Sequence, residues 1–469
     1  MSDAESGPVH SGGMFRSLRH RNYRLFFMGQ SISLIGNWLQ WAAMNWLIYE
    51  LTRSAFWLGA VGFCRISIMF VAPFAGILAD RMDRRQLIVV TQVMATIQPA
   101  MLAVLTLTGW INPYWIVALS IYAGIIAAFD IPIRQAFTVE MIDDRADLGN
   151  AIALNSTMVN GARLIGPAMA GVLIKLVGEG WCFFLNALSY LPVIWALLAM
   201  EIPVRRSGQT KHVLRELGDG VRYAFGFAPI RSVLLLLCLV SIAGMPYQQF
   251  MSAFAQDVLH VGPGMFGLLT SCVAIGAIIG AGYLASRRRA AGLEAVIPAA
   301  TFIFGVGLVL FSQSRDWWTA MPLLAVAGFG MMVQMASSNT VLQTICDEDK
   351  RGRVMSFYTM AFMGTVPLGQ LLAGNVASWL GPTTAVSLPR TLLLSGIVCI
   401  AGAAVFASNL TAFRRRVLPI YQRLGLMPSG PGDPGIGVTP APGAAVTGAP
   451  PAPVGVGGGP PTVPAGGVE

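Results

Sequence analysis

One carboxylate lies well inside an apolar stretch of this sequence, where an ionisable group could carry a proton. It is Asp130, and Arg134 follows four positions later. Residues four positions apart share one face of a helix, so these two side chains are placed to form an ion pair. Two interpretations stay open. The pair braces the end of a helix, or Asp130 is a protonation site.

Three arginines also fall within apolar stretches. Arg65 and Arg163 lie near the middle of theirs, and Arg390 lies near the end of another. A charge at mid-membrane costs about 2.5–3.5 kcal/mol on insertion scales, so it needs a partner or a wet cavity. If Arg65 and Arg163 face a central cavity, that cavity favours an anionic or catechol-rich ligand; alternatively, carbonyls or amides hold them as structural braces. Arg390 can extend its head group to the membrane surface.

Polar side chains recur within three apolar stretches. In the first stretch their spacing of three or four residues places them on one face of a helix. They favour either a cavity lining or hydrogen bonds between helices, because an unpaired polar group is costly in lipid. The candidates for a substrate cavity are Gln30, Ser33, Asn37, Gln40, Trp41, Arg65, Tyr247, Gln248, Gln334 and Ser338.

Composition determines the kind of element that carries these residues. Hydrophobic residues make up 55% of the 469 positions and charged residues 11%, whereas soluble proteins have about 25% charged residues. This excludes an ordinary soluble enzyme and a disordered chain. The six cysteines have no metal or disulfide spacing, and no phosphate-binding, zinc-protease or serine-hydrolase motif occurs. We therefore expect no enzyme, no metal and no cofactor.

Twelve apolar stretches reach the length of about 20 residues that a membrane-spanning helix needs. Helices satisfy their own backbone groups in lipid, so the sequence predicts an all-α integral membrane protein. The expected spans are 25–50, 55–79, 86–109, 113–136, 148–177, 181–200, 232–256, 263–285, 293–313, 317–343, 354–380 and 385–408.

The basic residues lie almost entirely on one side of these spans. Twenty-five of the 31 Lys and Arg residues fall on the side of the N-terminus, and three fall on the opposite side. Cytoplasmic loops are enriched in Lys and Arg, so we expect a multi-pass protein of the inner (cytoplasmic) membrane with both termini in the cytoplasm. This placement explains the net charge of +9 without a nucleic-acid partner.

The spans divide into two groups of six around a polar loop. We expect a cytoplasmic segment 1–24, a six-helix bundle 25–200, a cytoplasmic loop 201–231 with an amphipathic stretch along the membrane surface, a second bundle 232–408 and a cytoplasmic tail 409–469. Residues 428–469 include 11 Pro and 12 Gly and cannot bury enough apolar surface to fold. The tail is therefore expected to be disordered, with partner docking as the alternative.

The segment 76–85 resembles the gating loop of the major facilitator superfamily, whose members consist of two six-helix halves. A glycine there allows helices to approach closely, and an acid at a helix end can face a helix N-terminus or an arginine. Alternatively, the arginines only mark the cytoplasmic side. The gating candidates are Gly76, Asp80, Arg81, Arg84 and Arg85.

The segment 161–171 resembles the antiporter signature of the same superfamily. Small residues allow tight packing, and a proline bends the helix in a way that could limit proton leak. An ordinary packing seam is the alternative. The candidates are Gly161, Arg163, Gly166, Pro167 and Gly171.

Longer stretches are similar to the transmembrane secretion effector branch of this superfamily, from about residue 15 to 415. They are 21–27, 29–38, 129–137, 150–156, 184–189, 339–343 and 351–355. The resemblance implies twelve helices in two pseudo-symmetric six-helix bundles, with helices 1, 4, 7 and 10 lining the pathway. It also implies alternating access and export of a small organic molecule, siderophore-like or amphipathic, in exchange for protons.

One departure from the superfamily pattern matters. Residues 115–129 contain no arginine, whereas many superfamily antiporters carry one there, so proton coupling through that residue is not implied. Efflux of hydrophobic drugs, a lipid or solute translocator without antiport, and a membrane enzyme or receptor are the alternatives. The expected partners are a small-molecule substrate, protons and the lipid bilayer, and the chain is expected to act as a monomer.

Overall fold

The computed structural model describes residues 16–67, 84–141, 147–200, 223–287, 291–348 and 350–426. These residues form helices joined by turns, and no strand occurs among them. The prediction of an all-α protein is confirmed. Many large apolar side chains point outward, among them Leu176, Trp195 and Val104, each more than 60% exposed. An apolar exterior of this extent fits a lipid environment.

The first bundle holds the helices up to residue 199. Helix α1 packs on α6 and α7, and α4 packs on α5 and α7. Local signals fix their ends: the Asn112 side chain accepts a hydrogen bond from the backbone amide of Trp115 and caps α5. The elements are η1 (Arg16–Arg19), α1 (Arg21–Thr52), α2 (Ala55–Ser67), α4 (Arg84–Leu107), α5 (Pro113–Glu140), α6 (Leu148–Val177) and α7 (Glu179–Ala199).

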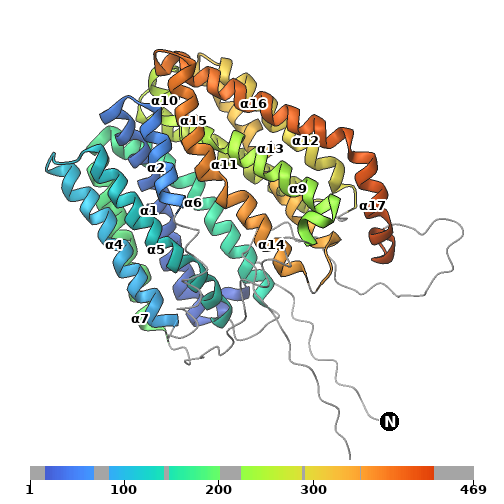
Figure 1. Ribbon diagram of the computed structural model, residues 1–469. Coiled ribbons are helices and arrows are strands. Elements are labelled where there is room, and N and C mark those ends of the chain that lie inside the picture. The colour runs from blue at the N-terminus through green and yellow to red at the C-terminus, as the bar shows by residue number, and fades with distance from the viewer. Residues whose placement is uncertain are drawn as a thin grey trace, which may run out of the picture.

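The second bundle is built around α13, which packs on α11 and α12, with α16 against α12. Figure 1 shows the two bundles side by side, with α6 and α11 between them. The elements are α9 (Ala228–Leu239), η4 (Val240–Gly244), η5 (Met245–Gln248), α10 (Met251–Asp257), α11 (Pro263–Ala285), α12 (Leu293–Gln313), α13 (Trp317–Ile345), α14 (Arg351–Thr359), η6 (Met360–Gly364), α15 (Val366–Leu380), α16 (Thr384–Ser408) and α17 (Leu410–Arg423).

Two of the expected spans are interrupted helices. A π-helical turn, η4, and a 3-10 turn, η5, lie between α9 and α10, and a second π-helical turn, η6, separates α14 from α15. Pro246 and Pro367 follow the two π turns, and each removes a backbone donor from the helical ladder. The sequence analysis did not predict these breaks.

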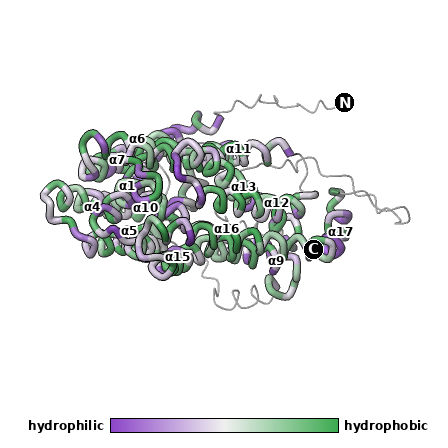
Figure 2. The backbone as a smooth tube through the Cα atoms, turned by 90° about the horizontal axis from the view of Figure 1, so that it is seen from above, coloured by the Kyte–Doolittle hydropathy of each residue, from purple (hydrophilic) through white to green (hydrophobic). Residues whose placement is uncertain are grey.

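Nine helical segments of the described chain are long and apolar enough to cross a membrane. They are α4, α5, α6, α7, α11, α12, α13 and α16, together with the segment Ala228–Gln248. Three further expected spans correspond to α1, α2 and the interrupted pair α14–α15, which are not among these nine segments. The count of twelve spans therefore stays a prediction. Figure 2 shows that the tubes of both bundles are mostly hydrophobic.

The end of the chain differs from the expected tail. Residues 410–423 form helix α17, whose buried side chains pack against the second bundle, because Phe413, Val417 and Tyr421 repeat at a spacing of four. The prediction that disorder begins at 409 was wrong for this stretch. The Pro- and Gly-rich part, from 427 on, and most of the loop 201–231 lie outside the described residues.

Candidate functional site

The two bundles meet along two pairs of helices, α6 with α11 and α2 with α15. Glycines allow α6 and α11 to approach each other closely. A Cβ atom on Gly267 would lie 2.3 Å from the carbonyl oxygen of Pro167, and one on Gly171 would lie 2.5 Å from that of Pro263. A side chain at either position would force α6 and α11 apart, so Pro167 and Gly171 of the antiporter signature lie at the contact between bundles.

The other glycines of that signature have different surroundings. A Cβ atom on Gly166 would lie 2.5 Å from the Cβ atom of Trp38, so this glycine allows α6 to approach α1 within the first bundle. Gly161 has open space where its Cβ would be. The signature therefore contributes both to the inside of one bundle and to the seam with the other.

Polar groups join α2 and α1 to the second bundle. The side-chain amide of Gln249 donates to the Asn45 side chain at 2.6 Å and to the carbonyl oxygen of Leu58 at 3.0 Å. Nearby, a Cβ atom on Gly59 would lie 2.5 Å from the carbonyl oxygen of Gln370. These hydrogen bonds must break if the two bundles separate here.

A carboxylate forms a further contact between the two bundles, at the end where α1 finishes. Asp257, at the end of α10, accepts hydrogen bonds from Tyr49 and Thr384, and Arg53 Nη1 lies 3.5 Å from it. We call these four residues the Asp257 cluster, and the end of the bundles that contains it the joined end. Tyr49 and Arg53 belong to the first bundle, whereas Asp257 and Thr384 belong to the second. The cluster borders a surface depression of about 530 Å³.

At the start of α10, whose other end carries Asp257, side chains from both bundles line a small void. Its volume of about 10 Å³ suits a single water molecule. The guanidinium of Arg163 lies 5.6 Å from the centre of the Trp38 ring, a cation–π distance. The lining residues are Trp38, Arg163, Gln248, Met251, Thr270 and Val273, from α1, α6, η5, α10 and α11.

The Asp130–Arg134 pair exists in the structure. Arg134 Nη2 lies 3.1 Å from Asp130 Oδ2, and the other carboxylate oxygen accepts hydrogen bonds from Thr91 at 3.0 Å and Gln92 at 2.6 Å. Asp130 is 7% exposed. The pair therefore belongs to a polar group shared by α4 and α5, and both of its interpretations remain compatible with this geometry.

Arg65 and Arg163 differ from Arg134 in their surroundings. Arg65 lies within electrostatic range of Tyr190, whose hydroxyl donates to Asn37 at 2.8 Å. In the described part of the chain, neither Arg65 nor Arg163 forms an ion pair or a hydrogen bond. Among the residues that the structure describes, the two central arginines thus have no acidic partner, whereas Arg134 has Asp130.

The polar face of α1 is used mainly inside the first bundle. Gln40 donates to Gln98 at 2.7 Å and accepts from Asn186 at 2.7 Å, which is the interhelical alternative. Asn37 joins Tyr190, as above. Gln30 and Ser33 are buried, and neither Gln30 Oε1 nor Ser33 Oγ has a hydrogen-bond partner among the described residues. Trp41 packs edge-on against Trp38.

The candidates of the second bundle lie on η5 and α13. Gln248 Nε2 lies 3.3 Å from the Tyr247 hydroxyl and 3.7 Å from Met331 Sδ. Gln334 and Ser338 are fully buried and weakly joined, at 3.4 Å, and Gln334 Oε1 has no partner in the described residues. Of this group, Gln248 is the one that reaches the void beside Arg163.

Most of the predicted gating loop cannot be compared with the structure. Gly76, Asp80 and Arg81 lie outside the described residues, and Arg84 begins α4 without a described side chain. Arg85 donates to the carbonyl oxygens of Leu197 and Leu198, at 2.8 Å each. A cation at the carboxyl end of a helix is favourable, so Arg85 fixes α4 to the end of α7.

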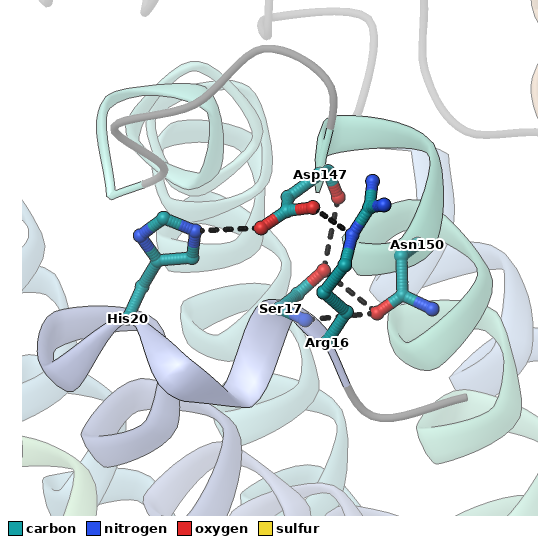
Figure 3. A network of polar contacts seen from close by, with 5 residues as sticks. All are labelled: Arg16, Ser17, His20, Asp147 and Asn150. Carbon is teal, nitrogen blue, oxygen red and sulfur yellow. Dashed lines mark hydrogen bonds and ion pairs between the residues drawn. The ribbon is translucent and has the colours of Figure 1, made fainter. Parts of the chain in front are cut away.

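A second polar network, drawn in Figure 3, lies where α1 begins, at the end opposite Tyr49 and Arg53. Asp147 binds Arg16 and accepts from His20 at 3.0 Å, while Ser17 donates its backbone amide to Asn150 at 3.0 Å. The hydrogen bond from His20 and the neighbouring Arg16 lower the pKa of Asp147. The network fastens η1 to the start of α6.

Sequence reasoning missed one residue that connects distant helices and noted another. Asp257 was not selected, because it ends a span where an acid is unremarkable. Gln249 was considered with Tyr247 and Gln248 as cavity lining or as a source of interhelical hydrogen bonds, and the structure has the hydrogen bonds. The partners of Asp257 are 208 and 127 positions away in the sequence. The one feature of the sequence that could have drawn attention to Asp257 is its place at the end of a span, on the side opposite the basic loops. The described residues contain no group of three metal-ligating side chains.

Comparison with known proteins places this architecture among transporters. A family model described as transmembrane secretion effector matches residues 12–416. A staphyloferrin A transporter of Staphylococcus aureus is 26% identical over 82% of this chain and 95% of its own length. The multidrug efflux pump Tap of Mycolicibacterium fortuitum is 24% identical, over 78% and 91%. The enterobactin exporter EntS of Salmonella choleraesuis is 25% identical, over 78% and 88%.

The fold is also found among solved structures. A bacterial homologue of the human lysosomal transporter Spinster, in an inward-facing and unoccupied conformation, superimposes with a TM-score of 0.67. The match covers 86% of this chain and 98% of that one, at 15% identity. This similarity supports the two-bundle arrangement described above.

Proposed function

Because this chain belongs to the transmembrane secretion effector family of the major facilitator superfamily, we propose that it exports a small anionic organic molecule in exchange for protons. Its named relatives are transporters and efflux pumps, so the chain is a transporter and not an enzyme. The substrate class we propose is siderophore-like, because two of those relatives are named for staphyloferrin A and enterobactin.

The observation that carries the proposal is the charge of Arg163. Its guanidinium borders the void between the bundles, on the ring of Trp38, and no described acid neutralises it. A charge in the membrane interior needs an opposite charge or water. A carboxylate or catecholate of a substrate would supply that opposite charge, and Gln248 from the second bundle would bind the same ligand with its amide.

The places where the bundles touch support alternating access as the mechanism that we propose. The Asp257 cluster, the Gln249 hydrogen bonds and the α6–α11 glycines all lie toward the joined end. The asymmetry of basic residues supports a joined end on the outside, with both termini in the cytoplasm. In this conformation a substrate would enter from the cytoplasm, and separation of the joined end would release it outside. Gly76, Asp80, Arg81 and Arg84 remain candidates for a gate on the cytoplasmic side.

Asp130 is the candidate for proton coupling. It is a buried carboxylate within the first bundle, paired with Arg134 and bound by Thr91 and Gln92. Protonation would remove its charge and leave Arg134 without its counter-charge. That change alters the electrostatic balance beside Arg65 and Tyr190, on the same side of the bundle.

A second function is favoured by the wall of the void. Trp38, Met251 and Val273 make most of it apolar, and a polarizable apolar wall accepts varied hydrophobic compounds. Together with the relative named as a multidrug efflux pump, this supports efflux of hydrophobic compounds as the alternative. A lipid or solute translocator without antiport is the third possibility. We propose in each case a monomer in the cytoplasmic membrane.

The test uses inside-out membrane vesicles with an acidified interior. Uptake and proton release are measured with a catecholate and carboxylate siderophore panel and with a panel of cationic lipophilic dyes. Hydrogen bonds to charged groups contribute about 1.5–3 kcal/mol, so R163Q should raise the KM for siderophores about 10- to 100-fold, whereas R163K should retain part of the affinity. R390Q is the matched control, since Arg390 bonds the Leu380 carbonyl at the edge of the bundle.

Each proposal has its own contrary result. Equal KM values for R163Q and R390Q would remove Arg163 from the binding site. A response to the dyes alone would favour the drug-efflux alternative. For coupling, D130N should abolish proton release at an unchanged amount of folded protein; loss of folded protein would instead support the structural role of the pair.

A further inference from the structure

Helix α17 presents two different faces. Phe413, Val417 and Tyr421 are buried and fix it against α9, α12, α13 and α16. Arg415 and Arg416 lie on the exposed side, together with the 42% exposed Leu418. The helix is thus held by its apolar face and displays positive charge away from the bundle.

The position of α17 places this exposed side near lipid. Only Asn409 separates it from α16, a helix long enough to span the membrane. Figure 2 shows α17 at the margin of the second bundle, beyond α12 and α9 and not beneath the centre. A helix in this position meets the head-group region of the bilayer, where basic residues and leucines of an amphipathic helix bind.

The four arginines of α17 are not equivalent. Arg414 is 3.2 Å from the buried carboxylate of Glu294, so its charge is compensated within the protein. Arg423 lies near Asp347, whose pKa is lowered by hydrogen bonds from Lys350 and Tyr223 and by the charge of Arg423. Arg415 and Arg416 form no ion pair with any residue that the structure describes. Two adjacent positive charges are therefore left for an external partner.

We propose that Arg415 and Arg416 bind the phosphate groups of anionic phospholipids and that α17 thereby anchors the second bundle to the membrane surface. The charges have the sign that complements such head groups, and a guanidinium can donate two parallel hydrogen bonds to phosphate. The exposed leucine extends the contact toward the acyl chains. This lipid site is independent of the proposed substrate and of proton coupling.

The test titrates the purified full-length chain in detergent micelles with fluorescent dioleoyl-phosphatidylglycerol and, separately, dioleoyl-phosphatidylcholine. A basic residue near an anionic surface changes affinity roughly fivefold, so R415Q/R416Q should bind phosphatidylglycerol roughly 30-fold more weakly than wild type. R415K/R416K keeps the charge and should retain most of the affinity. Raising the salt from 0.1 to 1 M should weaken wild-type binding, because the Debye length falls from about 10 to about 3 Å.

K175Q/R315Q is the control that removes two exposed charges outside α17. It should keep the wild-type affinity and preference for phosphatidylglycerol. Thermal unfolding of every variant establishes that each is folded. Two results would overturn the proposal: equal wild-type affinity for both lipids, or undiminished binding of phosphatidylglycerol by R415Q/R416Q.

Discussion

Replacement of Asp257 by Asn should open the joined end. The carboxylate accepts hydrogen bonds from Tyr49 of the first bundle and Thr384 of the second, and it lies 3.5 Å from Arg53. Asparagine has nearly the same shape but no charge. The bond from Tyr49 and the pair with Arg53 exist only while the two bundles touch at this end, whereas the bond from Thr384 lies within the second bundle. The substitution therefore weakens the contacts between the bundles without removing volume.

The magnitude follows from the number of contacts. A charge-assisted hydrogen bond is about twice as strong as a neutral one, which contributes about 1 kcal/mol, so the bond from Tyr49, which joins the two bundles, loses about 1 kcal/mol. The Arg53 side chain is 60% exposed, and an exposed ion pair adds about 0.5 kcal/mol or less. The total of about 1.5 kcal/mol is roughly a 13-fold shift, which would turn a 100:1 population into roughly 8:1.

The assay is electron–electron double resonance between spin labels on the two bundles. Labels at Trp110, in the α4–α5 connection, and at Trp318, at the start of α13, replace highly exposed residues. The six free cysteines are replaced first. D257N should add a longer distance with a population of roughly a tenth. D316N is the control, because Asp316 is an exposed acid at the start of α13. An unchanged distribution in D257N, or the same change in D316N, would refute the reasoning.

Two further predictions concern α11 and the opposite end. G267A should also separate the joined end, because its Cβ would lie 2.3 Å from the Pro167 carbonyl; G282A, where space is open, should give the wild-type distances in the same experiment. The pKa of Asp147 is lower in the folded protein than in the unfolded chain, where it is about 4. This difference stabilises the folded state at pH values above about 4, and the contribution disappears as the pH falls through the folded-state pKa. Thermal unfolding of wild type and D147N should therefore differ at pH 7 and converge at pH 3. A constant difference across that range would contradict the assignment to the His20–Asp147 contact.

Local patterns in the sequence predicted the features that depend on nearby residues. Asp130 and Arg134 pair because they are one helical turn apart, and the glycines around Pro167 make a close contact because small residues allow one. The apolar stretches predicted the helices for the same reason: each helix bonds within itself.

Features that depend on distant residues could not be read from one sequence. The two π turns are breaks inside apolar stretches, and η4 lies where Gly244 meets the Phe304 ring of another helix. The direction in which a polar side chain of α1 points depends on the helix beside it: periodicity placed Gln40 on a polar face but could not name Gln98 as its partner. Asp257 was missed for the same reason.

The hydrogen bonds of α1 fall into two groups under the alternating access that we propose. Gln40 joins Gln98 and Asn186, which belong to the same bundle, so these bonds would be kept if the bundles rotated as rigid units. Asn45 lies little more than one turn further along the helix and accepts from Gln249 of the second bundle, so this bond must break when the joined end separates. Loss of Gln40 should therefore act on the stability of one bundle, whereas loss of Asn45 should act on the balance between conformations. A single helix thus holds one bundle together and also forms part of the closure against the other.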